Sequence, residues 1–273
     1  MPELPEVETT RRGLVPLLLG RRFLDVHVRE RRLRELVHVA SLRKLRGAEV
    51  TGLRRRSKYL LIDTDAGLTL LIHLGMSGRL WVADAHRPDA KHQHVVLDLD
   101  NGRQLRFADP RRFGMVKALQ TARLDRHPRL RGLGPDPLDE SLTGEDLFRA
   151  TRGRRKPVKS FLLDTRAIAG IGNIYACEAL HRAGINPKRA VGRIGRARWE
   201  DLLAALREVL LEAIAAGGTT LRDFLNAEEH AGYFALSLRA YDCEGERCRR
   251  CSGTIRRIVQ AGRSTFYCPT CQR

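Results

Sequence analysis

Residues 95–107 read VVLDLDNGRQLRF, and this stretch indicates the fold of the N-terminal half of the chain. Before the turn, apolar residues recur at every second position, which is the pattern of a strand with one buried face. Asn101-Gly102 is the dipeptide most typical of a two-residue hairpin turn. The alternation resumes after the turn and ends at Phe107. The stretch therefore predicts an antiparallel β-hairpin.

More segments of this kind surround the hairpin. We expect strands at Phe23–Val28, Val50–Arg56, Tyr59–Asp63 and Leu68–Leu74. Residues 20–120 are thus predicted to be mostly antiparallel β-structure, with a helix near residues 40–46. A β-sandwich with flanking helices fits this pattern best. Ahead of it, Pro5 suits the first turn of an N-terminal helix, and Pro16 should kink or end that helix.

The second half of the chain is predicted to be helical. Residues 127–141 are rich in Gly and Pro, a composition typical of a linker. Thr143 can cap a helix over Glu145–Ala150. An amphipathic stripe from Trp199 to Ile214 predicts a long helix that Gly217-Gly218 ends. Shorter helices are expected at residues 157–164 and at 173–182, the latter capped by Asn173.

The composition favours a polyanionic partner. The chain has 273 residues, with 50 Lys and Arg against 32 Asp and Glu, a formal net charge of +18. Such an excess is most often a sign of nucleic-acid binding. An Arg-rich proteome would explain Arg in place of Lys, but not this imbalance. The acidic N-terminus lacks the apolar core of a signal peptide, and no apolar run approaches membrane-spanning length. We therefore expect a soluble intracellular protein.

Four of the six cysteines form two close pairs near the C-terminus. The spacing is Cys248-x2-Cys251-x16-Cys268-x2-Cys271, with a short predicted hairpin between the pairs. Two such pairs provide four thiolates for one tetrahedral zinc ion. A closed site of this kind folds the chain and does no catalysis. A redox pair or an iron–sulfur cluster is the alternative. Cys177 is expected to pack in a helix, and Cys243 to be a spare thiol.

The first residues can be interpreted in two ways. Removal of Met1 would leave Pro2 as a secondary α-amine. An α-amine has a pKa of roughly 7.7–8.0, so a useful fraction is neutral near pH 7 and can form a Schiff base. Glu3 would then stand beside it as an acid or base. In the alternative interpretation, Pro2 and Glu3 only begin a helix.

Several segments together resemble one family, the bacterial formamidopyrimidine-DNA glycosylases. They keep the family's order along nearly the whole chain and are Met1–Thr9, Arg56–Leu61, His73–Gly78, Asp109–Gly114, Ala169–Tyr175 and the cysteine hairpin. The resemblance implies an enzyme that excises 8-oxoguanine and formamidopyrimidines from duplex DNA and then cuts the strand by β,δ-elimination. It implies a bifunctional glycosylase and abasic-site lyase that acts as a monomer in the bacterial cytoplasm, on DNA with oxidised bases or abasic sites.

The resemblance also implies a multidomain α+β fold. The expected parts are an N-terminal catalytic β-sandwich with flanking helices, a linker, a helical domain with a helix–two-turn–helix module, and a C-terminal zinc-finger β-hairpin with one structural Zn²⁺. Their predicted bounds are 1–126, 127–141, 142–235 and 236–273.

Four residues match the family's catalytic positions. Pro2 matches the nucleophile, which attacks C1′ of the damaged nucleotide, and Glu3 matches the residue that handles protons at the sugar. Lys58 matches a proton donor for β-elimination, although a solvated hairpin lysine is the alternative. Arg263 matches the residue for the final elimination. A guanidinium does not readily release a proton, so we expect Arg263 to bind phosphate and stabilise charge.

Three further residues match the side chains that fill the gap left by the extruded base, namely Met76, Arg111 and Phe113. Apolar wedges of this kind hold a kinked duplex open. Without the resemblance, a core Met, a strand-end Arg and a core Phe would be the simpler interpretation.

Four more residues match the family's other DNA contacts. Asn173 and Lys159 match phosphate-binding positions, and His92 and Arg154 match further contacts. The basic run from Arg152 to Lys156 can be aligned in more than one way, and a solvated basic face is the alternative for it. Contacts to phosphate position a protein without reading base sequence.

Two alternatives to this function are weighed. The sister family, endonuclease VIII, shares the fold and nucleophile but prefers oxidised pyrimidines. Its members usually begin Met-Pro-Glu-Gly-Pro, so Leu4 in this sequence argues against it. A non-enzymatic zinc DNA-binding protein should have lost Pro2, Glu3 or Lys58, but all three are present. Residues 217–233 correspond to the family's base-covering loop. They depart from the usual pattern at 226–231, which leaves lesion preference open.

Overall fold

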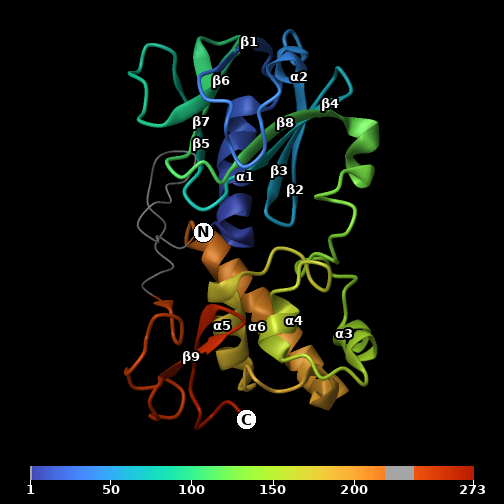
Figure 1. Cartoon of the computed structure of the whole chain (residues 1–273), viewed down its shortest axis with the longest axis vertical. Helices are drawn as coiled ribbons and strands as arrows, with labels where there is room; N and C mark the ends of the chain where they lie inside the picture. Colours follow the sequence, from blue (N-terminus) through green and yellow to red (C-terminus); the bar gives the residue numbers. More distant parts are fainter. Residues whose placement is uncertain (1, 219–236) are drawn as a thin grey trace. The chain divides into compact units, whose positions relative to one another are not determined.

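The computed structural model describes residues 2–218 and 237–273, and these residues form two compact units (Figure 1). The N-terminal unit contains residues 2–131 and 216–218, and the second unit contains 132–215 and 237–273. The finer domain boundaries predicted at residues 126, 141 and 235 remain a proposal. Among the described residues, no helix is long and apolar enough to cross a membrane.

The N-terminal unit is the predicted β-sandwich, made of two four-stranded antiparallel sheets. One sheet contains, in order, β1 (Phe23–Val28), β6 (Gln93–Leu99), β7 (Arg103–Ala108) and β5 (Arg79–Asp84). The other contains β2 (Val50–Arg56), β3 (Tyr59–Thr64), β4 (Leu68–His73) and β8 (Met115–Gln120). Apolar side chains of both sheets form one buried core.

The hairpin predicted from residues 95–107 is confirmed as β6 and β7. Val95 pairs with Phe107 and Leu97 pairs with Leu105, so the apolar positions of the two strands lie side by side. All four side chains are at most 1% exposed. Asn101-Gly102 lies in the turn. The alternation in the sequence therefore marks the face that closes the sandwich.

Two helices lie against the sandwich, as expected. Helix α1 (Leu4–Leu18) contacts β2 and β3 of one sheet and β5 of the other. It runs through Pro16 and ends two residues later, where the Leu19 N–H donates to Val15 O. Helix α2 (Val39–Arg43) contacts β1 and β8. A 3₁₀ helix, η1 (Thr121–Arg126), follows β8.

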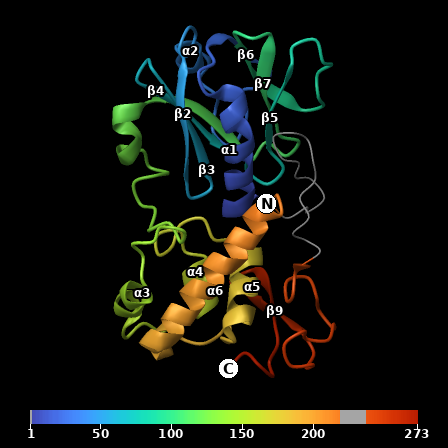
Figure 2. The same ribbon diagram turned by 180° about the vertical axis from the view of Figure 1, so that it is seen from behind.

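The second unit is helical, with a C-terminal hairpin. Its elements are α3 (Gly144–Thr151), α4 (Val158–Leu162), α5 (Asn173–Ala183), the 3₁₀ helix η2 (Val191–Arg193), α6 (Arg196–Ala215), β9 (Arg256–Gln260) and β10 (Arg263–Tyr267). The long helix α6 packs against α3 and α5 (Figure 2). Thr143 caps α3 as predicted. The predicted cap at Asn173 is wrong by one residue, because Gly172 is the cap and the Asn173 side chain bonds elsewhere.

Candidate active site and metal centre

Strand register brings three loops to one end of the second sheet. Tyr59 pairs with His73, and His73 pairs with Met115. The β2–β3 turn comes just before Tyr59, the β4–β5 loop just after His73, and the β7–β8 loop just before Met115. In the other sheet, Ala108 pairs with both Arg79 and Gln93. The two longer loops and the approach to β6 therefore leave both sheets at the same end of the sandwich.

Five of the predicted site residues lie on these segments. They are Lys58 in the β2–β3 turn, Met76 in the β4–β5 loop, His92 before β6, and Arg111 and Phe113 in the β7–β8 loop. The Lys58 side chain is mostly buried, and His92 is exposed with a left-handed backbone, φ 62°. Residues that are far apart in sequence thus gather at one end of one unit.

The direction of α1 brings its N-terminus to the same end. Arg11 Nη1 donates to Leu53 O at 3.3 Å, and Arg55 Nε donates to Glu8 Oε2 at 3.3 Å. The helix therefore runs opposite to β2. The five residue steps from Glu8 back to the N-cap Glu3 span about 7.5 Å, and the two steps from Arg55 to Ser57, in the β2–β3 turn, span about 7 Å. Glu3 is thus level with the turn that carries Lys58.

Acidic side chains line the buried start of α1. Pro2 is buried, and Glu3 and Glu6 are 3% and 2% exposed. The Glu3 N–H donates to Glu6 Oε2 at 2.7 Å, which fixes the first turn of the helix. The first turn is fixed immediately after Pro2, so the position of the predicted nucleophile is set by the helix start.

Glu8 ties this helix to β2 by charge. Burial disfavours its ionised form, but hydrogen bonds from Arg11 and Arg12 and the charge of Arg55 outweigh burial and lower the pKa of Glu8 to about 2. The carboxylate is therefore ionised throughout the physiological range. The Arg55 side chain is only 9% exposed and also donates to Ser57 O at 3.1 Å. Glu8 and Arg55 thus link α1 to the turn that holds Lys58.

His73 is a neutral histidine at the end of β4. Burial, together with the positive charges of Arg34, Lys58 and Arg129, lowers its pKa to about 4. Its Nδ1 accepts the Gly75 N–H at 2.9 Å. A neutral ring is needed for this bond, since a protonated imidazole has no acceptor. His73 therefore supports the loop that carries Met76.

The three predicted gap-filling side chains point away from the core. Met76 is 38% exposed and Phe113 is 41% exposed, which excludes the alternative that both are core residues. The Arg111 guanidinium lies 5.0 Å from the centre of the Phe113 ring, a cation–π contact. Large exposed apolar side chains beside a cation suit insertion into a stack of bases.

In the second unit, Lys159 and Asn173 converge on β10. Lys159 Nζ donates to Ser264 O at 3.0 Å and to Thr265 Oγ1 at 2.7 Å. Asn173 Nδ2 donates to the same Ser264 oxygen at 2.9 Å. Lys159 is 1% exposed, so its ammonium bonds to protein groups in this state. Arg263, the exposed first residue of β10, is next to this anchor.

Arg154 lies at an open basic pocket of about 580 Å³. The pocket is lined by Gly153, Arg154, Arg155, Ala190, Gly192 and Arg193. The Gly192 N–H donates to Arg154 O at 3.0 Å, which holds the two loops together. A hollow lined by three arginine residues suits a phosphate.

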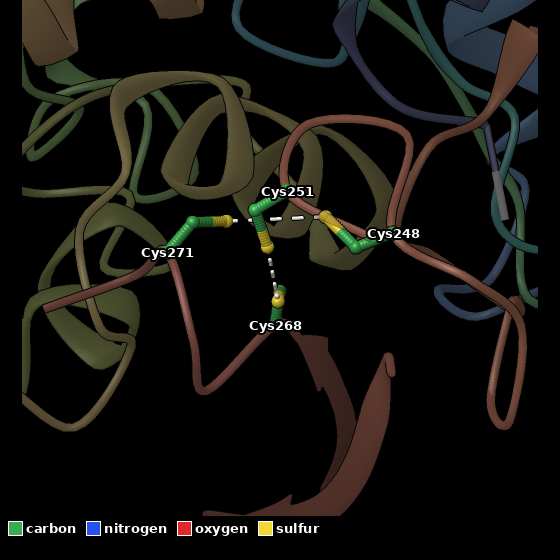
Figure 3. A group of neighbouring side chains, drawn as sticks. All are labelled: Cys248, Cys251, Cys268 and Cys271. Atoms are coloured by element: carbon green, nitrogen blue, oxygen red, sulfur yellow. Dashed lines mark hydrogen bonds between the residues drawn. The ribbon is translucent and has the colours of Figure 1, made fainter. Parts of the chain in front are cut away.

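The four predicted thiol ligands meet at the base of the β9–β10 hairpin (Figure 3). Their sulfur atoms all lie within 4.8 Å of one another. A tetrahedral zinc ion with Zn–S bonds of about 2.3 Å separates its sulfurs by about 3.8 Å. Two of the sulfur–sulfur distances are 3.9 Å (Cys248 to Cys271) and 3.5 Å (Cys251 to Cys268). The donor set and its dimensions fit zinc, and Cys243 is not part of the cluster.

Two side chains of α5 hold the zinc segment. His181 Nε2 lies 3.2 Å from Cys248 Sγ, and His181 is 2% exposed. Glu178, 4% exposed, accepts the backbone N–H groups of Arg239, Ala240 and Tyr241 at 2.7–3.0 Å. Cys177, on the same helix, is buried as expected.

Comparison with known proteins identifies the family. Three family models match the chain: the formamidopyrimidine-DNA glycosylase N-terminal domain at residues 1–116, the H2TH domain of the same enzymes at 133–225, and the zinc finger found in FPG and IleRS at 245–273. The chain belongs to the formamidopyrimidine-DNA glycosylase family. The H2TH match agrees with the predicted helix–two-turn–helix module, and the zinc-finger match with one structural zinc ion.

Individual members of the glycosylase family match over their whole length. The formamidopyrimidine-DNA glycosylase of Phenylobacterium zucineum is 50% identical, with both chains fully covered. A Lactococcus lactis Fpg mutant in complex with Fapy-dG-containing DNA is 31% identical with a TM-score of 0.92, again with full coverage of both chains. The MutM (Fpg) protein of Thermus thermophilus is 40% identical with a TM-score of 0.88, covering 99% of this chain and 98% of that one.

Several supporting residues were not predicted from the sequence. They are Glu8, His73, Glu178 and His181, together with Asp109 in the β7–β8 loop. For His73, Glu178 and His181, an acidic or imidazole side chain inside a largely apolar helix or strand was the available signal, whereas Glu8 and Asp109 carry no such signal. The predicted base-covering loop lies outside the described residues, apart from Gly217 and Gly218.

Proposed function

We propose that this member of the glycosylase family excises oxidised purines from duplex DNA and then cuts the strand at the abasic site. The observation that carries the proposal is the gathering of the α1 N-terminus, Lys58, Met76, Arg111 and Phe113 at one end of the sandwich. Lactococcus lactis Fpg has been solved with DNA that contains Fapy-dG or an abasic site. The same substrate class is proposed here.

The first step assigns the nucleophile to Pro2. Once Met1 is removed, the neutral Pro2 nitrogen attacks C1′ of the damaged nucleotide. The N–C1′ bond forms, the glycosidic bond breaks and the base leaves with its electron pair. The Pro2 nitrogen then loses its proton and the C1′–O4′ bond breaks as O4′ takes up a proton, which gives an iminium ion that accepts electrons and acidifies the C2′ hydrogen. Loss of that proton expels the 3′ phosphate, and a second elimination expels the 5′ phosphate.

Three side chains handle protons and charge in this scheme. Glu3 lies directly after Pro2 and transfers protons at the sugar. Lys58, mostly buried at the level of Glu3, donates a proton during β-elimination. Arg263, exposed at the start of β10, binds the departing phosphate and stabilises its charge.

Other side chains hold the duplex. Met76, Arg111 and Phe113 occupy the space left by the extruded base, whose extrusion costs a few kcal/mol. His92, Arg154 and Asn173 contact the DNA backbone. Lys159 would join them only by sharing its ammonium between phosphate and β10, to which it is already bonded.

The zinc ion has a structural role in this proposal. Four thiolates leave no open position, so the ion supplies folding energy and no catalytic chemistry. The hairpin it stabilises carries Arg263. Since the substrate is chromosomal DNA, we also propose that the protein works in the bacterial cytoplasm, associated with the nucleoid.

The test is covalent trapping. The protein is incubated with duplex DNA carrying 8-oxoguanine opposite cytosine, and borohydride is added to reduce the iminium ion. A covalent protein–DNA adduct is expected for the natural protein and none for Pro2→Gly. A duplex with an oxidised pyrimidine is the comparison. No adduct on either duplex would overturn the lyase mechanism, and a stronger adduct on the oxidised pyrimidine would overturn the purine preference.

A further inference from the structure

Asp109 is a buried carboxylate at the start of the β7–β8 loop. It is 0% exposed, yet it is none of the residues assigned above to chemistry or DNA contact. Its Oδ1 accepts the Ser77 hydroxyl at 2.7 Å and the Arg111 N–H at 3.3 Å. Its Oδ2 accepts the Gly114 N–H at 2.7 Å. Three donors thus point at one carboxylate.

The donors belong to two separate loops. Ser77 comes from the β4–β5 loop, which carries Met76. Arg111 and Gly114 come from the β7–β8 loop, which carries Phe113. The Arg111 N–H also lies 3.3 Å from Ser77 Oγ, so that hydroxyl is shared between the loops. The carboxylate therefore closes a hydrogen-bonded link between the two segments.

The backbones of these loops touch where the link forms. A Cβ on Gly75, which has φ +68°, would lie 2.5 Å from Gly114 N. A Cβ on Gly114 would lie 3.0 Å from both Asp109 Oδ2 and His73 O. Real Cβ atoms essentially never lie as close as 2.5 Å to backbone, and a 3.0 Å approach is tighter than almost all real Cβ contacts. Two glycines are needed for the loops to come within reach of one carboxylate.

The main chain of Asp109 is held as firmly as its side chain. Its N–H donates to His92 O at 3.1 Å, and its carbonyl accepts from His94 Nε2 at 2.8 Å and from the Arg112 N–H at 3.2 Å. The last bond closes a turn with Pro110 at its second position, an arrangement that favours Asp first. Asp109 thus also fixes the segment before β6.

We infer that Asp109 is a positioning residue that locks the Met76 loop and the Arg111–Phe113 loop into one rigid wedge. The inference rests on the proposed function of these three side chains as gap fillers. All three are exposed side chains, so their position depends strongly on the backbone beneath. A carboxylate suits this site because both of its oxygens accept hydrogen bonds, whereas an amide would turn an NH₂ group toward one of three donors.

The inference predicts a split between two activities. Excision of 8-oxoguanine needs the base extruded and the gap filled, whereas nicking of a preformed abasic site needs no base extruded. In Asp109→Asn, single-turnover excision should fall by about 100-fold, the effect of a displacement near 1 Å. Nicking of an abasic duplex should change little. Asp84→Asn, at an exposed position at the other end of β5, is the matched control.

A second variant and a second measurement keep the inference decidable. Ser77→Ala removes only the hydroxyl that crosses between the loops and should show the same split at smaller size. In the DNA-free protein, Asp109→Asn should speed amide hydrogen exchange in residues 75–78 as well as in 110–114. Exchange that changes only in 110–114, or excision and nicking that fall equally, would overturn the inference. An inactive natural protein would overturn the proposed function, and the exchange data would still decide whether Asp109 joins the loops.

Discussion

Lys159 and Asn173 donate to the same acceptor, the carbonyl oxygen of Ser264, at 3.0 and 2.9 Å. The two donors come from different helices, α4 and α5, and the acceptor comes from β10 about a hundred residues later. Lys159 also donates to Thr265 Oγ1, and Thr265 is fully buried. These bonds fix the strand that begins with Arg263.

Loss of the Lys159 ammonium should loosen β10. Lys159→Met keeps the volume of the side chain but removes the donor to the buried Thr265 Oγ1 and one of the two donors to Ser264 O, at a cost of about 1–3 kcal/mol. We expect a lower midpoint of urea unfolding and faster amide exchange in residues 263–267 of the DNA-free protein. Lys156→Met, at an exposed position, is the control. If Lys159 served phosphate alone, exchange without DNA would stay unchanged.

The bond between His181 and Cys248 should slow zinc loss. An imidazole N–H directed at a thiolate holds the ligand in place, and such supporting contacts are typically worth about 10–100-fold in metal affinity. His181→Phe should therefore release zinc to a chelator faster than the natural protein, as followed with a colorimetric zinc indicator. His181→Gln retains an N–H donor and should restore part of the retention. Equal release from both variants would show that only the packing of the ring matters.

His73 should make the N-terminal unit less stable in acid. The pKa of His73 is about 4 in the folded chain against an ordinary value of 6.5, so the unfolded chain takes up the proton first as pH falls. The contribution of neutral His73 to the free energy of unfolding is complete above pH 6.5, and it is lost as the pH falls from 6.5 to about 4. One pKa unit corresponds to about 1.4 kcal/mol, so the loss is roughly 3 kcal/mol.

Urea unfolding at several pH values checks this. His73→Gln does not titrate but retains an oxygen to accept the Gly75 N–H, so the slope of stability against pH should flatten between pH 4 and 6.5. His86→Gln removes an exposed histidine and should leave the slope as it is. An unchanged slope in His73→Gln would place the acid sensitivity elsewhere.

Local patterns predicted the elements that carry a clear signal. The β6–β7 hairpin was found because its alternation and its turn lie within a few residues. Strands β5 and β8 were not predicted individually. In β5, residues 80–83 are all buried, so no alternation marks the strand. Its partner β7 is set by pairs such as Trp81 with Arg106, which no local window contains.

The site was predicted by resemblance, and its geometry comes from long-range pairing. Nothing near Lys58 in the sequence indicates that Phe113 will lie at the same end of the sheet, because that follows from the register of β3, β4 and β8. The burial of Lys159 was equally hidden. A lone lysine is usually solvated, and the acceptors that permit its burial are 105 and 106 residues away.

The ion pair between Glu8 and Arg55 should control both stability and chemistry. Glu8→Gln weakens charged hydrogen bonds from Arg11 and Arg55 at a site where Glu8 is 7% exposed, and should cost about 1.5–3 kcal/mol. Glu49→Gln breaks the exposed pair with Arg22 and should cost less than about 1 kcal/mol.

Because Glu8 sets how α1 lies along β2, Glu8→Gln should also shift the helix start that carries Pro2. The rate of borohydride trapping on an abasic duplex should then fall by about tenfold or more, while Glu49→Gln traps at the natural rate. A Glu8→Gln protein that is destabilised but traps as fast as the natural one would show that this ion pair holds the fold without positioning the nucleophile.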